Sequence, residues 1–194
     1  MNRLTDYHHR PPELVTIDGC DYLLNGNFQN VILTQEALLD DELYDWEKAE
    51  IVLENMYSEP YPENINEAVK QAVNYIMQNR EVTEADKDKP VFLDFSQDGQ
   101  LIFDAFLSAG VNLDMSNMTY WIFASHLREL PKDCMFCRII YLRLQTHRGK
   151  LTEDEKTEIQ RIGEDVVYLK DVKKERHYSA IDAAFEEYFS QLEQ

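Results

Sequence analysis

The spacing of apolar and polar positions changes near residue 28. Before it, residues 14–17 and 21–24 are short runs rich in apolar and β-branched residues, and Asp18-Gly19 lies between them. Asp-Gly supplies the positive φ angles that a two-residue hairpin turn requires. We therefore expect one short N-terminal β-hairpin. A lone hairpin is marginal in water, so its apolar face should lie on the helices that follow.

Beyond residue 28 the apolar period is near 3.6, which is typical of helices. The clearest pattern runs from Ile65 to Met77, where apolar residues recur at i, i+3, i+4, i+7, i+8, i+11 and i+12. Further helices are expected over residues 31–39, 43–56, 97–107, 117–130 and 133–146. Asp40-Asp41 should cap the helix over residues 43–56, and Ser96 should cap the helix over residues 97–107. The expected inward stripe of the 43–56 helix is formed by Leu43, Trp46, Leu53 and Met56.

Two amphipathic helices are expected at the C-terminal end. Thr152-Glu153-Asp154-Glu155 has the spacing of a capping box and should start a helix that continues to about Lys170. A basic connector follows, and Ser179 should cap a last helix. The narrow apolar stripes of these two helices are our candidate partner-binding residues, and they could also pair two copies of the chain. They are Ile159, Ile162, Val166, Leu169, Ile181, Phe185, Tyr188 and Leu192.

The predicted architecture is mainly α, a helical bundle of about seven to eight helices with one short N-terminal β-hairpin. We expect a flexible N-terminus over residues 1–12 and a helical domain over 13–170, with a polar linker near 81–90 that Pro90 closes. Residues 171–194 complete the chain as the basic connector and the C-terminal amphipathic helix.

Composition and charge argue against several classes of function. The 194 residues include 19 Lys and Arg against 37 Asp and Glu, a net charge of −18, so phosphates and anionic lipid surfaces should repel the chain. We expect no nucleic-acid partner and no membrane contact. The N-terminus lacks the apolar stretch of a signal peptide, and three cysteines form no disulfide framework. These features favour the cytoplasm.

The negative charge is concentrated in one stretch. From Glu36 to Glu67 there are eleven acidic residues and a single basic one, Lys48. This stretch is either a solvated face that keeps the protein soluble or a docking surface for a basic partner. An acidic decoy that mimics nucleic acid is a third interpretation, but a decoy would spread its carboxylates over much of its surface.

Residues that suggest catalysis are scarce, so we expect no catalytic residues, no cofactor and no enzyme. Cys134 and Cys137 have C-x-x-C spacing, and His126 and His147 are near in sequence, but a structural zinc site usually needs a second close ligand pair. The thiols also fall on a helical apolar stripe, where cysteine acts as a small core residue. We therefore predict packing residues and no metal site.

Several short motifs, which together span residues 13 to 170, resemble those of a family of tailed-bacteriophage proteins. That family is encoded in the tail-morphogenesis region, just before the tape-measure protein. The motifs are Gly19 to Leu39, Asp40-Asp41-Glu42-Leu43, Phe92-Leu93-Asp94-Phe95-Ser96-Gln97-Asp98 with Ile102, Ala105-Phe106, Gly110 and Leu113, Trp121-Ile122-Phe123 with Leu127, and Leu130-Pro131 with Asp133, Phe136, Ile139-Ile140 and Arg143.

The resemblance implies a tail assembly chaperone of a long-tailed phage or prophage in a Gram-positive host. Such proteins coat the tape-measure protein, keep it soluble and help tail-tube subunits polymerise around it. The implied partners are the tape-measure protein and the major tail tube protein, and the implied location is the host cytoplasm. The family has no catalytic residues to transfer. A minor structural tail protein is the alternative within the same resemblance.

Overall fold

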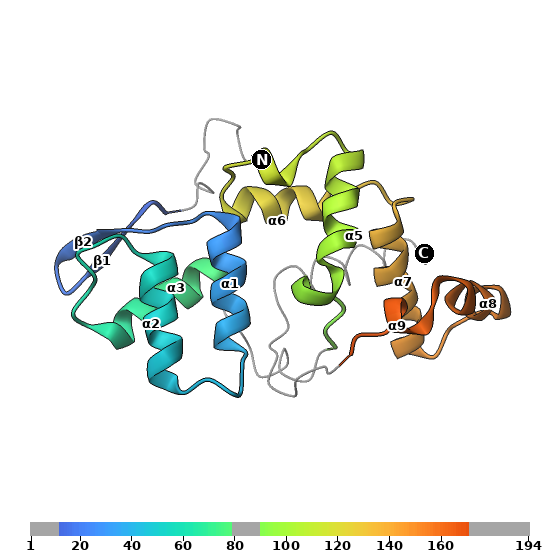
Figure 1. Cartoon of the computed structure of the whole chain (residues 1–194), viewed down its shortest axis with the longest axis horizontal. Helices are drawn as coiled ribbons and strands as arrows, with labels where there is room; N and C mark the ends of the chain where they lie inside the picture. The colour runs from blue at the N-terminus through green and yellow to red at the C-terminus, as the bar shows by residue number, and fades with distance from the viewer. Residues whose placement is uncertain (1–11, 79–89, 171–194) are drawn as a thin grey trace, which may run out of the picture. The chain divides into compact units, whose positions relative to one another are not determined.

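The structure is a computed structural model that describes residues 12–78 and 90–170 (Figure 1). Within these ranges it has eight α-helices and one antiparallel hairpin, so the expected mainly α fold with an N-terminal hairpin is confirmed. The predicted N-terminal segment up to residue 11, the linker residues 81–89 and the whole segment 171–194 lie outside the described residues. That last segment includes Ile181, Phe185, Tyr188 and Leu192.

The described residues form two compact units. The N-terminal unit comprises residues 12–78 together with 118–123, and the C-terminal unit comprises 90–117 and 124–170. Apart from residue 12, both lie in the range 13–170, for which the sequence indicated a single helical domain. Each unit is described by itself.

The hairpin of the N-terminal unit pairs β1 (Leu14–Ile17) with β2 (Cys20–Leu23). Ile17 lies opposite Cys20, so Asp18 and Gly19 form the turn, with φ angles of 50° and 81°. This is the turn that Asp-Gly predicted. Ile17 is buried, so the apolar side of the hairpin contributes to the core of this unit.

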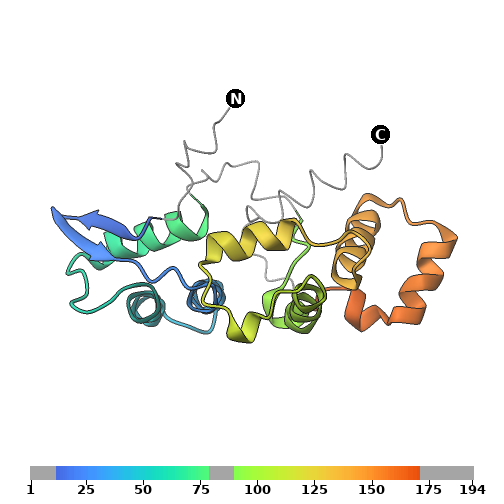
Figure 2. The ribbon, with the colours of Figure 1, turned by 90° about the horizontal axis from the view of Figure 1, so that it is seen from above.

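Three helices follow, α1 (Phe28–Leu38), α2 (Asp45–Met56) and α3 (Ile65–Ile76), and α2 packs against the other two (Figure 2). The buried side of α2 is formed by Val52 and Met56. Trp46, which the pattern placed inward, is 65% exposed. The expected caps of α2, Asp40-Asp41, were also wrong. The helix begins after Tyr44, whose N–H donates to the Glu47 carboxylate (2.8 Å).

Residues 118–123 complete the N-terminal unit from much later in the chain. The N–H of Tyr120 donates to the Gly26 carbonyl (2.8 Å), and the indole N–H of Trp121 donates to the Tyr75 carbonyl (3.0 Å). The rings of Phe28 and Phe123 stack with centroids 4.9 Å apart. These contacts join residues 118–123 to the start of α1 and to the C-terminal end of α3.

The C-terminal unit contains α5 (Phe95–Ser108), the short 3-10 helix η1 (Leu113–Met115), most of α6 (Tyr120–Arg128), α7 (Met135–Arg148), α8 (Glu153–Ile162) and α9 (Glu164–Val167). Asp94, not Ser96, caps α5, because its carboxylate accepts the Gln97 N–H. The capping box from Thr152 to Glu155 is confirmed. The helix expected to reach Lys170 instead ends at Ile162, because Gly163 has a φ of 112°.

A buried ion pair holds the C-terminal unit together. Asp98 on α5 is 0% exposed, Arg143 on α7 is 6% exposed, and two parallel hydrogen bonds of 2.7 and 2.8 Å join them. The guanidinium also donates to the backbone carbonyls of Phe92, Val166 and Val167. All five of its N–H groups therefore have acceptors, and one side chain links α5, α7 and α9.

Candidate functional site

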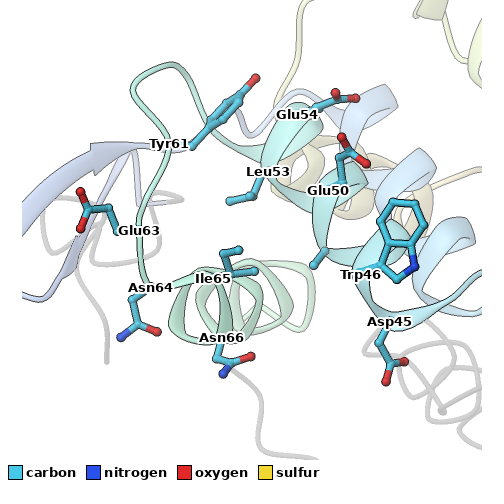
Figure 3. Close-up of a pocket in the computed structure, with 11 residues that line it drawn as sticks. Asp45, Trp46, Glu50, Leu53, Glu54, Tyr61, Glu63, Asn64, Ile65 and Asn66 are labelled. Atoms are coloured by element: carbon cyan, nitrogen blue, oxygen red, sulfur yellow. The ribbon is translucent and has the colours of Figure 1, made fainter.

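The N-terminal unit carries an open groove between α2 and the start of α3, with a volume of about 850 Å³ (Figure 3). Its lining comes from one face of α2 and from the segment that leads into α3. The lining residues are Asp45, Trp46, Ala49, Glu50, Leu53, Glu54, Tyr61, Glu63, Asn64, Ile65 and Asn66. Its volume lies within the range of ligand pockets, but its open form suits an extended partner better than an enclosed small molecule.

The middle of the groove is apolar. Trp46, Ala49 and Leu53 follow each other along α2 at i, i+3 and i+7, so they lie along one side of the helix. Figure 3 shows Leu53 and Ile65 in the middle, with Tyr61 toward one end and Trp46 toward the other. Ile65 is 46% exposed. Exposed aromatic and branched side chains in a concave surface are typical of binding sites.

Carboxylates surround this apolar strip. Asp45, Glu50, Glu54 and Glu63 all line the groove, and the lining contains no Lys or Arg. Within the described part of the chain, none of the four forms a salt bridge. Glu50 and Glu54 are four residues apart on α2, a spacing at which like charges repel each other and weaken a helix. The groove therefore combines apolar surface with uncompensated negative charge.

The walls of the groove are held by contacts on their other sides. The hydroxyl of Tyr57, just after α2, donates to the Ala68 carbonyl on α3 (2.7 Å). Burial of the Tyr57 hydroxyl raises its pKa, so it stays a neutral donor. Asn64 caps α3, because its side-chain oxygen accepts a hydrogen bond from the Glu67 N–H. Its side-chain N–H donates to the Asp18 carboxylate in the hairpin turn (2.9 Å). The groove is consequently a preformed surface.

The candidate partner-binding residues of the C-terminal stripes do not line the groove. Ile159 on α8 is 3% exposed and packs with Leu142 and Val167, while Ile162 lies partly buried against the same cluster. Val166 and Leu169 are partly buried. Ile181, Phe185, Tyr188 and Leu192 are outside the described residues. Partner binding by these stripes stays a prediction, and the side chain of Ile159 already has a packing role.

The two thiols of the C-x-x-C pair have local structural roles. Cys134 caps α7, and its sulfur accepts a hydrogen bond from the N–H of Cys137 (3.5 Å). Cys137 itself is buried. Burial and the nearby Cys134 raise the pKa of the Cys137 thiol, which disfavours a reactive thiolate. The rings of His126 and His147 lie edge-on to phenylalanine rings. Among the described residues, no three His, Cys, Asp or Glu side chains group as a metal site would require.

The sequence pattern did not identify the groove. It placed Trp46 and Leu53 in the core, and it treated the acidic stretch from Glu36 to Glu67 as a whole. The structure brings four of these acids to one concave surface and leaves Trp46 exposed among them. The sequence feature that could have indicated the groove is a tryptophan flanked by acidic residues, Asp45-Trp46-Glu47, within the most acidic part of the chain.

Comparison with known families gives one match. Residues 9–168 match the family described as Bacteriophage Gp15 protein. No curated protein and no solved structure matches the chain. No helix in residues 12–78 or 90–170 is long and apolar enough to cross a membrane.

Proposed function

We propose that this chain, which belongs to the bacteriophage Gp15 protein family, is a phage tail assembly chaperone. In this role it binds the tape-measure protein, keeps it soluble and supports polymerisation of the tail tube around it. The chain acts by binding, without catalysis or a cofactor, in the cytoplasm of the infected or lysogenic host. The major tail tube protein is a second expected partner.

The observation that supports this proposal best is the groove on the N-terminal unit. A chaperone of a long helical protein needs exposed apolar surface that covers the partner's apolar stripes, and it must itself stay soluble. Trp46 and Ile65 provide such surface, and the surrounding carboxylates keep it hydrated when no partner is present. The net charge of −18 would keep the resulting complex soluble as well.

The motifs that resemble tail-assembly proteins also have a structural explanation that does not involve catalysis. Phe92, Asp98 and Arg143 all belong to those motifs, and all three take part in the buried hydrogen-bond network of the C-terminal unit. A fully paired, buried Arg–Asp contact has no free acid, base or nucleophile to offer to a substrate. These three motif residues are therefore explained by the packing of the C-terminal unit, which is compatible with a binding protein.

Co-expression with the tape-measure protein encoded in the same genome tests the proposal. We expect the tape-measure protein to move from the insoluble to the soluble fraction and to co-purify with the chain. Unchanged solubility with no co-purification would show that the proposal is wrong. Detection of the chain in purified virions would instead identify it as a minor structural tail protein.

A further inference from the structure

We propose that the groove between α2 and α3 binds one class of partner segment, an amphipathic helix whose apolar face is flanked by Lys or Arg. This inference rests on the proposed function only for the identity of the protein that carries the helix. The chemistry of the segment follows from the groove itself, because its apolar strip lies among four carboxylates and no cations.

The dimensions of the groove suit a helix. Its α2 wall runs from Asp45 to Glu54, which is about 14 Å at the α-helical rise per residue. Helices that dock in grooves use apolar anchors at i, i+3 or i+4, and i+7, which span about 10 Å. Two turns of a partner helix therefore fit along the strip that Trp46, Ala49 and Leu53 form.

Charge decides between kinds of amphipathic helix. An acidic helix would bring like charges against Asp45, Glu50, Glu54 and Glu63, and a neutral one would leave these carboxylates uncompensated at the edge of an apolar contact. A helix with basic residues beside its apolar face neutralises them and relieves the repulsion between Glu50 and Glu54. Electrostatic steering by the same carboxylates should make association fast and sensitive to salt.

A peptide titration tests the inference. The probe is a synthetic 18-residue helix of leucine and lysine with one apolar face, compared with the same peptide carrying glutamate at every lysine position. Binding is followed by the fluorescence of Trp46, and Trp46→Phe shows how much of the signal comes from this residue. We expect the lysine peptide to bind at least about tenfold more tightly than the glutamate peptide.

Two charge variants separate the groove from general attraction to an acidic protein. Glu50→Lys/Glu54→Lys changes two groove carboxylates. Asp114→Lys/Glu129→Lys makes the same charge change at exposed positions of the C-terminal unit. The groove variant should weaken binding of the lysine peptide at least about tenfold and improve binding of the glutamate peptide, while the control variant should change either affinity less than about twofold.

Several results would overturn the inference. Equal weakening by both variants would mean non-specific attraction, and equal binding of the two peptides would mean that charge does not select the partner. A native dimer that dissociates in the groove variant would assign the groove to a second copy of the chain. If the groove variant holds the tape-measure protein as well as the native chain does, the inference fails although the proposed function stands. If the lysine peptide binds the groove but the tape-measure protein stays insoluble, the proposed function fails instead.

Discussion

Replacing Asp98 with Ala should lower the free energy of unfolding of the C-terminal unit by about 3–5 kcal/mol, the usual cost of removing one partner from a buried ion pair. The substitution leaves two of the five N–H groups of Arg143 without acceptors and leaves its charge uncompensated at 6% exposure. It also removes the acceptor of the Asp94 N–H (2.9 Å). The cost is therefore mainly a desolvation penalty, not the loss of one contact.

The double variant Asp98→Ala/Arg143→Met tests this reasoning further. It removes the buried charge together with its counter-ion, so it should cost clearly less than the sum of the two single changes. Some cost remains, because the carbonyls of Phe92, Val166 and Val167 then lose their donor. Lys156→Ala is a matched control in the same unit. It breaks an exposed salt bridge to Glu153 and should cost less than about 1 kcal/mol.

Urea unfolding followed by far-UV circular dichroism measures these effects. For a slope of about 2 kcal/mol per M, the loss in Asp98→Ala corresponds to a midpoint lower by about 1.5–2.5 M. Both tryptophans, Trp46 and Trp121, belong to the N-terminal unit, so their fluorescence follows that unit separately. A destabilisation of Asp98→Ala no larger than that of Lys156→Ala would refute the proposed role of the ion pair.

Three further predictions concern single side chains. In Gly26→Ala the new Cβ would lie 2.0 Å from the Tyr75 hydroxyl oxygen, so we expect the free energy of unfolding to fall by about 1–3 kcal/mol. Urea unfolding followed by tryptophan fluorescence measures this loss, and an unchanged midpoint would contradict the prediction. Burial raises the pKa of Tyr75 from 10.0 to about 12, so the neutral Tyr75 hydroxyl contributes stability below pH 10 that is lost as the pH rises toward 12. Tyr75→Phe should therefore reduce the alkaline fall in thermal stability, and an equally steep fall in the variant would argue against this role. The Gln97 side chain binds the backbone of Tyr168 and Lys170 (both 2.9 Å), so Gln97→Ala should speed amide exchange of Lys170, and an unchanged rate would show that the contact does not hold this segment.

Elements with a local chemical signal could be predicted from the sequence. Asp18-Gly19 and the capping box from Thr152 to Glu155 each satisfy their own backbone, so neighbouring residues suffice to specify them. The error at Gly163 arose because apolar residues continue at helical spacing across the glycine. The choice of Ser96 instead of Asp94 as the cap of α5 missed a local signal, because Gln97 follows Asp94 at the spacing of a helix start.

The candidate site depends on contacts between residues far apart in the sequence. Whether Trp46 lies in the core or in a groove is decided by how α3 packs beside α2, and the period of α2 alone does not contain that information. Arg143 gave a partial signal, because it is a charged residue among Ile139, Ile140 and Leu144 in an apolar helix. Its partner is 45 residues away and is one of 37 acidic residues, so the pairing could be found only from the fold.

Hydrogen exchange measured by mass spectrometry on the co-expressed complex with the tape-measure protein tests the binding surface most directly. The groove predicts that backbone amides over residues 45–56 and 61–66 exchange more slowly in the complex than in the free chain. Residues 153–169, which carry the alternative stripe of Ile159 and Ile162, should exchange at the same rate in both. Protection confined to residues 153–169, with none in the groove, would contradict the account.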